Sequence, residues 1–174
     1  MDLLEHQRCM ARNSLWSNDR LYRAVLSLGP GEFEAARTSF FPSIKATLNH
    51  LLEVDLFYMA FLEESGAQST FVAFDEADEL ALAQAGVDRR LVEFCDKLAR
   101  NDLDRRVITD RGEAGRIPER IGDLLAHLFV HDIHHRGQVH AMLSGSSVAP
   151  PQLDEFFLDY DLRFRKDEVE RLGL

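Results

Sequence analysis

Histidines are concentrated in one short stretch of this 174-residue sequence. Five of the seven fall within positions 127–140, namely His127, His131, His134, His135 and His140. Imidazole is the commonest metal ligand among side chains, and its charge changes near neutral pH. The concentration therefore indicates metal binding or acid–base chemistry.

Spacing separates these histidines from one another. Residues four apart on an α-helix differ in direction by about 40°, so His131 and His135 would project side by side and could hold one ion. His134 and His140 would point about 100° and 140° away from His135, so neither joins the pair easily. Apolar residues on the same stripe place the pair on the core-facing side of a helix. These residues are Leu124, Leu128 and Met142.

A further histidine, His50, lies near the middle of the most apolar segment of the chain. A single histidine on an apolar face is more often a hydrogen-bonded core residue than a ligand, because a buried imidazole needs a partner of some kind. If the two segments are neighbouring helices, His50 could meet His131 and His135. Three nitrogens with an open fourth position are typical of catalytic zinc sites.

The apolar pattern predicts four long helices to carry these residues. Gly29-Pro30-Gly31 and Gly145 mark helix ends, while Pro42 and Pro118 suit first helical turns. The sequence therefore predicts an all-α protein, a four-helix bundle forming one domain over residues 1–174. The predicted helices span residues 2–28, 42–65, 75–100 and 118–143.

Two shorter features complete this prediction. Residues 107–109, followed by Asp110-Arg111-Gly112, indicate a short hairpin between the third and fourth helices. The last dozen residues are mostly charged, which predicts a short carboxyl-terminal helical segment with a solvated face.

Composition excludes several function classes. The chain carries 20 basic and 30 acidic side chains, a net charge of -10, and no basic patch, so nucleic acid is not an expected ligand. No apolar run approaches the roughly 18 residues of a membrane span, and the amino terminus does not resemble a signal peptide. We therefore expect a cytoplasmic protein without membrane contact. Two cysteines, Cys9 and Cys95, are too few for a disulfide framework and are expected to be reduced.

The second predicted helix is apolar on more than one face. A four-helix core cannot cover all of this surface, and a large exposed apolar patch usually marks an interface. We therefore expect a homodimer formed through this helix and its neighbours.

Three segments resemble the DinB-like family of four-helix metal-binding proteins. Residues 127–140, HLFVHDIHHRGQVH, resemble its histidine signature. Residues 41–50, FPSIKATLNH, resemble the segment with the first ligand, and residues 16–21, WSNDRL, resemble its first helix. The resemblance covers nearly the whole chain and implies that His50, His131 and His135 bind a divalent metal ion. It also implies a long middle connection and, frequently, a homodimer.

Some members of that family use the metal to activate a low-molecular-weight thiol for transfer to an electrophile or for isomerisation. Three neutral imidazoles leave a divalent ion its full charge, which lowers the pKa of bound water towards about 7 and deprotonates a bound thiol more readily. We therefore expect a metal-dependent enzyme, a thiol S-transferase or a hydrolase, that uses zinc or nickel. A non-catalytic metal-binding bundle and an interaction module with structural histidines are the alternatives.

Two polar residues near the predicted ligands have open roles. Glu53, three residues after His50, could act as a base or an additional ligand, although a solvated carboxylate is its more frequent role. Gln138, close to one turn beyond His135, could orient a ligand through its amide or bond to a neighbouring helix.

Three other residues of the histidine segment also carry expectations. His127 precedes His131 by one turn and is expected at the edge of the site, as a donor to a ligand. Arg136 is expected to pair with a carboxylate at an interface. Gly137 inside a helix indicates the close approach of another helix.

Overall fold

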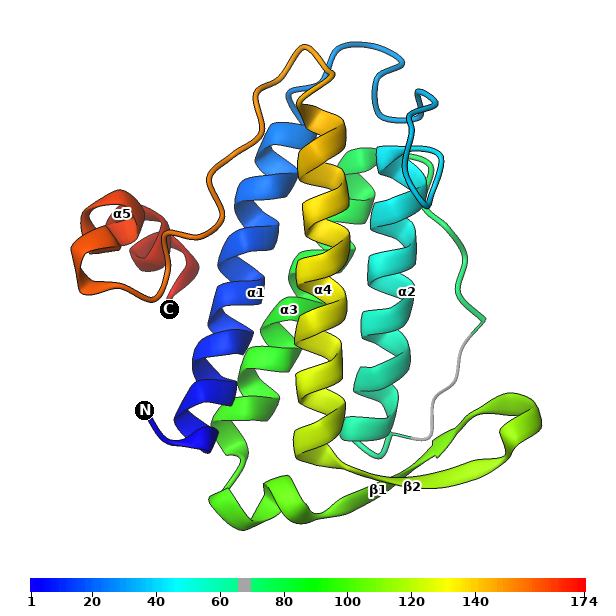
Figure 1. Cartoon of the computed structure of the whole chain (residues 1–174), viewed down its shortest axis with the longest axis vertical. Coiled ribbons are helices and arrows are strands. Elements are labelled where there is room, and N and C mark those ends of the chain that lie inside the picture. Colours follow the sequence, from blue (N-terminus) through cyan, green and yellow to red (C-terminus); the bar gives the residue numbers. More distant parts are fainter. Residues whose placement is uncertain (66–69) are drawn as a thin grey trace.

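The computed structural model describes residues 1–65 and 70–174, and this part of the chain contains four long helices (Figure 1). Helices α1 and α2 each pack on both α3 and α4, so α4 lies between α1 and α2. A shorter helix, α5 (Leu162–Leu172), lies outside the bundle beside α1 (Figure 1). The predicted all-α bundle is confirmed. Its long helices are α1 (Leu3–Val25), α2 (Ile44–Leu62), α3 (Ala77–Lys97) and α4 (Ile121–Leu143).

Side-chain caps set where two of these helices begin. The Asp2 carboxylate accepts a hydrogen bond from the Glu5 amide at 2.9 Å, and the Ser43 hydroxyl accepts one from the Ala46 amide at 3.1 Å. Such an oxygen satisfies an amide that the helix itself leaves unpaired. Helix α2 therefore begins at Ile44, just after Ser43, and Pro42 lies outside it.

The start predicted for the fourth helix at Pro118 is wrong. Pro118 lies in strand β2 (Arg116–Arg120), opposite Ile108 of the antiparallel strand β1 (Arg106–Asp110). Both strands of a two-stranded sheet are edge strands, which tolerate proline. The predicted hairpin is thus confirmed and is longer than expected. Short 3-10 helices precede and interrupt it, η1 (Arg100–Asp104) and η2 (Gly112–Ala114), and a third, η3 (Asp159–Asp161), precedes α5.

Two glycines of α4 differ in what surrounds them. A Cβ at Gly122 would lie 3.2 Å from the carbonyl oxygen of Leu103, so η1 approaches the helix closely there. A Cβ at Gly137 would meet nothing within 4 Å. The predicted close approach at Gly137 is therefore wrong, because this residue faces open space.

Most of the apolar surface of α2 is covered within the chain. All residues of α2 are described, and none of its large apolar side chains is exposed. Helices α3 and α4 pack along it, and the hairpin reaches its end, where the Arg111 guanidinium donates to the Tyr58 hydroxyl at 3.0 Å. Four large apolar side chains of α2 stay partly exposed, namely Val54, Leu56, Phe57 and Phe61, and the homodimer stays a prediction.

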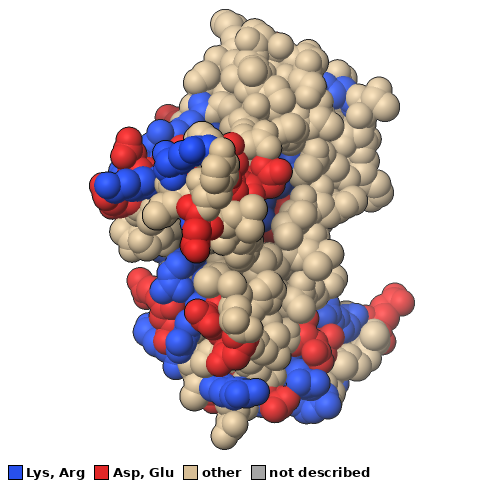
Figure 2. All heavy atoms as spheres, turned by 60° about the vertical axis from the view of Figure 1, so that its left-hand side comes forward, with Lys and Arg blue, Asp and Glu red and all other residues tan. Residues whose placement is uncertain are grey.

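Helix α5 is attached to α1 by polar contacts. One carboxylate oxygen of Glu168 accepts hydrogen bonds from the Trp16 indole and from Arg20, each at 2.7 Å, and Arg171 pairs with Asp19 at 2.6 Å. No residue of α5 is buried. Charged side chains accordingly gather over α5 in Figure 2, as predicted for a solvated carboxyl-terminal segment.

Among the described residues, no helix combines the length and the apolar character needed to cross a membrane. Cys9 and Cys95 are both free, as expected.

Candidate metal centre

Three histidines from two helices meet at the contact between α2 and α4. His50 comes from α2, and His131 and His135 come from successive turns of α4. Each offers one ring nitrogen, and these nitrogens all lie within 4.8 Å of one another. The structure thus brings together the three residues that the sequence singled out.

The separation of two of these nitrogens suits a shared ion. Nε2 of His50 and Nε2 of His131 are 3.2 Å apart. Two nitrogens bound to one tetrahedral zinc ion at about 2.0–2.1 Å would lie about 3.3 Å apart. Nδ1 of His135 is hydrogen-bonded to the Gln138 side chain at 2.9 Å, which leaves Nε2 of His135 for an ion. The donor set therefore fits a transition-metal ion.

Burial favours the neutral, metal-binding form of two of the clustered histidines. It is the largest cause that lowers the pKa of both His50 and His135 below 6.5, and the neighbouring charge of His131 lowers both further. The hydrogen bond to Gln138 raises the pKa of His135 without reversing the shift. Because a metal ion needs the neutral imidazole, these shifts reduce competition by protons near neutral pH.

An aromatic ring forms one wall of the cluster. The ring centroid of Phe41, in the loop before α2, lies 4.5 Å from that of His50 and 5.7 Å from that of His135. Phe41 lies in the segment 41–50 that resembles the DinB-like family. Nothing else in the sequence indicated that its ring would contact the histidines. Its contribution is to exclude water from this side of the nitrogens.

A carboxylate lies behind the cluster. Nδ1 of His131 is enclosed without a hydrogen-bond partner in the described chain, and so is Oδ1 of Asp132, 3.8 Å away. The charge at Asp132 favours a proton on Nδ1 and therefore a free electron pair on Nε2. Sequence reasoning missed Asp132, although it directly follows His131.

The other predicted site residues lie outside the cluster. Gln138 bonds to His135 and also to His134, whose Nε2 is 3.0 Å from the Gln138 side-chain nitrogen. Glu53 is exposed and offers no atom within the 4.8 Å group. His127 is also exposed, and its ring centroid is 6.5 Å from that of His131, so it lies at the edge of the cluster. His140 faces a different pocket.

Buried polar side chains fill the middle of the bundle behind Asp132. Asn18 of α1 donates to both carboxylate oxygens of Asp88 at 3.0 Å. Gln84 donates to Asp55 at 2.6 Å and to Asp88 at 3.0 Å. Burial raises the pKa of Asp88 to about 7. It also raises the pKa of Asp55 well above its ordinary range, and the charges at Asp132 and Asp88 add to that effect.

Arg136 supplies the positive charge of this network. Its Nη1 donates to Ser14 and Asn18 at 3.3 Å and lies 3.8 Å from the Asp132 carboxylate. The carboxylate predicted for Arg136 is therefore found inside the bundle. The sequence did not indicate the network, because its members come from four separate helices.

Comparison with known proteins adds independent support for the resemblance. The sequence model of the DinB family matches residues 4–163 of the chain. The protein named "Protein DinB" from Bacillus subtilis (strain 168) is 22% identical over 153 residues, which cover 81% of this chain and 86% of that protein. The matched range contains all three clustered histidines and the four long helices, apart from the first residue of α1.

Proposed function

The chain belongs to the DinB family, and from that premise we propose that it is a metal-dependent enzyme that transfers a low-molecular-weight thiol to an electrophile. In this proposal His50, His131 and His135 hold one divalent transition-metal ion, zinc or nickel. The observation that carries the proposal is the convergence of three nitrogens, two of them 3.2 Å apart, in a partly buried place.

The chain contributes imidazole nitrogens that are already held in position to bind an ion. When bound, the ion supplies a positive charge that lowers the pKa of a thiol or water beside it. A hydrogen bond to Gln138 orients the imidazole of His135, the Asp132 carboxylate lies 3.8 Å behind that of His131, and Phe41 shields one side. Burial keeps His50 and His135 neutral, so the full charge of the ion is retained.

The make-up of the converging ligand atoms, which are imidazole nitrogens alone, favours thiol transfer over hydrolysis. Among the described residues, no Asp or Glu joins the group of converging ligand atoms, and Glu53 is exposed. The ion lowers the pKa of either nucleophile, but a thiol is the more acidic of the two and loses its proton more readily, so it depends less on a positioned general base. The sulfur would form a bond to the electrophilic carbon, the leaving group would depart with the electron pair of its bond, and the thiol proton would pass to solvent.

Metal content and turnover test this proposal in sequence. Protein purified without chelator, or reconstituted with zinc or nickel, should hold about one ion per chain by mass spectrometry. His131→Ala should lose it, and His134→Ala, one position from a ligand, should keep it. Protein that takes up no ion would instead favour an interaction module with structural histidines.

The loaded protein is then assayed with several thiols and a chromogenic aryl halide. Thiol-dependent release of halide that His131→Ala abolishes supports the transferase. Cleavage of a chromogenic ester without thiol would indicate a hydrolase. A loaded protein active in neither assay would favour a non-catalytic metal-binding bundle.

A further inference from the structure

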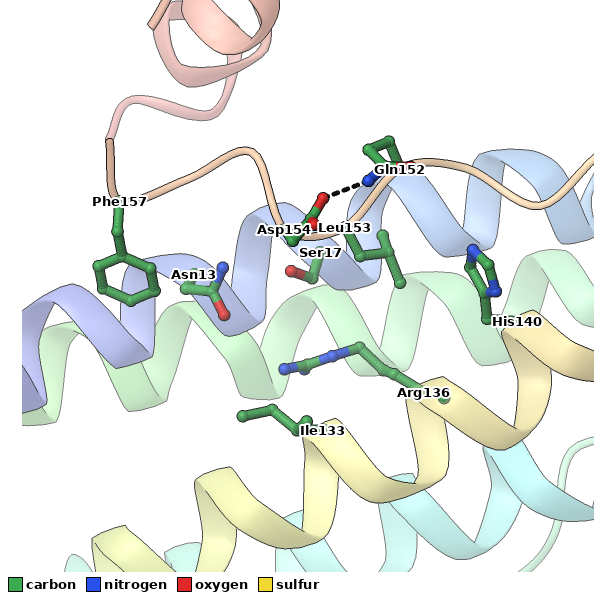
Figure 3. Close-up of a pocket in the computed structure, with 10 residues that line it drawn as sticks. Asn13, Ser17, Ile133, Arg136, His140, Gln152, Leu153, Asp154 and Phe157 are labelled. Carbon is green, nitrogen blue, oxygen red and sulfur yellow. Dashed lines mark hydrogen bonds between the residues drawn. The ribbon is translucent and has the colours of Figure 1, made fainter. Parts of the chain in front are cut away.

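A second pocket lies on the opposite flank of α4 from the histidine cluster. It has a volume of about 510 Å³ and is bounded by α1, α4 and residues 152–157, which pass over it (Figure 3). None of the three clustered histidines lines it. Its volume falls within the range of about 300–1,000 Å³ found for small-molecule sites.

Three buried polar side chains present free hydrogen-bonding groups to this pocket. Asn13 is 7% exposed, Ser17 2% and Arg136 3%. Within residues 1–65 and 70–174, no hydrogen bond engages the side chain of Asn13 or Ser17, or Nε and Nη2 of Arg136. These unpartnered atoms are not fully enclosed by protein. Since their residues line the pocket, the atoms are accessible from it. Figure 3 shows the Arg136 side chain extending from α4 towards Ser17 and Asn13 on α1.

The free atoms of Arg136 form one edge of its guanidinium. Nη1 is already bonded to Ser14 and Asn18, which fixes the group in place. Nε and Nη2 are the two donors on the side that can bind both oxygens of a carboxylate at once. The hydroxyl of Ser17 and the amide of Asn13 can donate to the same oxygens.

The rest of the lining is mainly apolar. Ile133 and Phe157 are 51% and 44% exposed, so both retain apolar surface that a ligand could cover, and Leu153 lies on the segment above. Gly137 keeps the α4 side open, because nothing lies within 4 Å of the position of a Cβ. Asp154, on the segment above, is an exposed lining residue whose carboxylate accepts a hydrogen bond from the Gln152 amide.

We propose that this pocket binds a small carboxylate with an apolar body. The carboxylate pairs with the Nε and Nη2 edge of Arg136, beside Ser17 and Asn13, and the apolar body covers Ile133, Leu153 and Phe157. The nearest guanidinium nitrogen to the Asp132 carboxylate is Nη1, at 3.8 Å, so Asp132 does not occupy the edge formed by Nε and Nη2. This site is separate from the proposed metal chemistry and does not depend on it.

Phenylacetate is a suitable probe, and phenylacetamide is its uncharged counterpart. Ligand-observed NMR titration should show saturable binding of phenylacetate at concentrations up to roughly 20 mM, above the millimolar constant expected of so small a ligand. Phenylacetamide should bind at least about tenfold more weakly, because it cannot form the charge-assisted double hydrogen bond.

A pair of glycine variants locates the binding. Gly137→Leu fills the pocket from α4 and should abolish the titration. Gly86→Leu makes the same change on α3, where a Cβ also meets nothing within 4 Å, and should leave the titration unchanged. Both should keep the parent melting temperature or exceed it, because leucine favours a helix more than glycine does.

Three results would overturn the proposal. They are the absence of saturable binding, equal binding of acid and amide, and binding that survives in Gly137→Leu. His135→Ala separates this site from the histidine cluster, since a carboxylate held by a metal ion would be lost in that variant and kept in Gly137→Leu. The proposed pocket predicts the reverse pattern.

Discussion

Nδ1 of His135 donates its hydrogen to Oε1 of Gln138 at 2.9 Å, while the amide nitrogen of Gln138 donates to Nε2 of His134 at 3.0 Å. An amide oxygen can only accept, so this contact places the proton of His135 on Nδ1. The electron pair of His135 is therefore on Nε2, towards the cluster. One exposed turn of α4 thus sets the tautomer of a buried ligand.

Replacing Gln138 by leucine should weaken metal binding without ending it. Removal of a partner that orients a metal-binding histidine typically costs about 10–100-fold in affinity. Competition with a chromophoric chelator measures the change. His134→Ala removes the outer contact only and should bind the metal as the parent does. Equal affinity in parent and Gln138→Leu would mean that the hydrogen bond does not prepare His135.

The histidines should respond unequally to alanine substitution. Loss of any one of the three converging imidazoles leaves two, which hold an ion far less well. Metal stoichiometry by mass spectrometry distinguishes the groups, and full occupancy in His50→Ala would exclude α2 from the site. His50→Ala, His131→Ala and His135→Ala should lose the metal, and His127→Ala, His134→Ala and His140→Ala should keep it.

The stability of the metal-free chain should carry a pH dependence from Asp88. Its folded-state pKa of about 7 exceeds the unfolded value of 3.8, so the folded state binds the extra proton between these values. Stability contributed by this group is present below pH 3.8 and is lost as pH rises to about 7. The loss is on the order of 4 kcal/mol at most.

Urea denaturation of parent and Asp88→Asn, in chelator and at several pH values, isolates this contribution. His50 and His135 act in the opposite direction, because their lowered pKa values make the folded state gain stability as pH rises through 6.5. The difference between parent and variant removes that background. A difference in unfolding free energy that does not change with pH would contradict the burial of an ionisable Asp88.

The cap of α2 should have a measurable energetic effect. Ser43→Ala leaves the Ala46 amide without its side-chain acceptor and should lower the free energy of unfolding by about 1 kcal/mol. Ser144→Ala, on an exposed residue after α4, should change it by less than about 0.5 kcal/mol. Urea unfolding monitored by circular dichroism makes the comparison, and equal stabilities would show that the cap contributes nothing.

The histidine cluster was predictable because its signal is local. Angular spacing pairs His131 with His135, and the apolar surroundings of His50 require it to have a partner. The start of α4 was not predictable in the same way, because Pro118 suits both a first helical turn and an edge strand. The cytoplasmic location and the homodimer stay predictions.

The buried acids and the second pocket depend on contacts between distant segments. In the sequence, Asp55 and Asp88 cannot be distinguished from aspartates on the exposed surface of a helix. Only the packing of the helices places them beside Gln84 and Asn18. A glycine inside α4 predicts a close neighbouring helix at Gly137, and the structure instead has open space there. A helical glycine can mark a neighbouring helix or an open space, and spacing alone does not distinguish these.

Helix α4 contributes side chains both to the histidine cluster and to the pocket beside α1. His131 and His135 face α2, whereas Arg136 and Gly137 face the pocket beside α1. A helix that moves as a rigid body carries all of its residues together, so a shift caused by an occupant on one side reaches the other side undiminished. The 3.2 Å between Nε2 of His50 and Nε2 of His131 would record any such shift, because only one of the two belongs to α4.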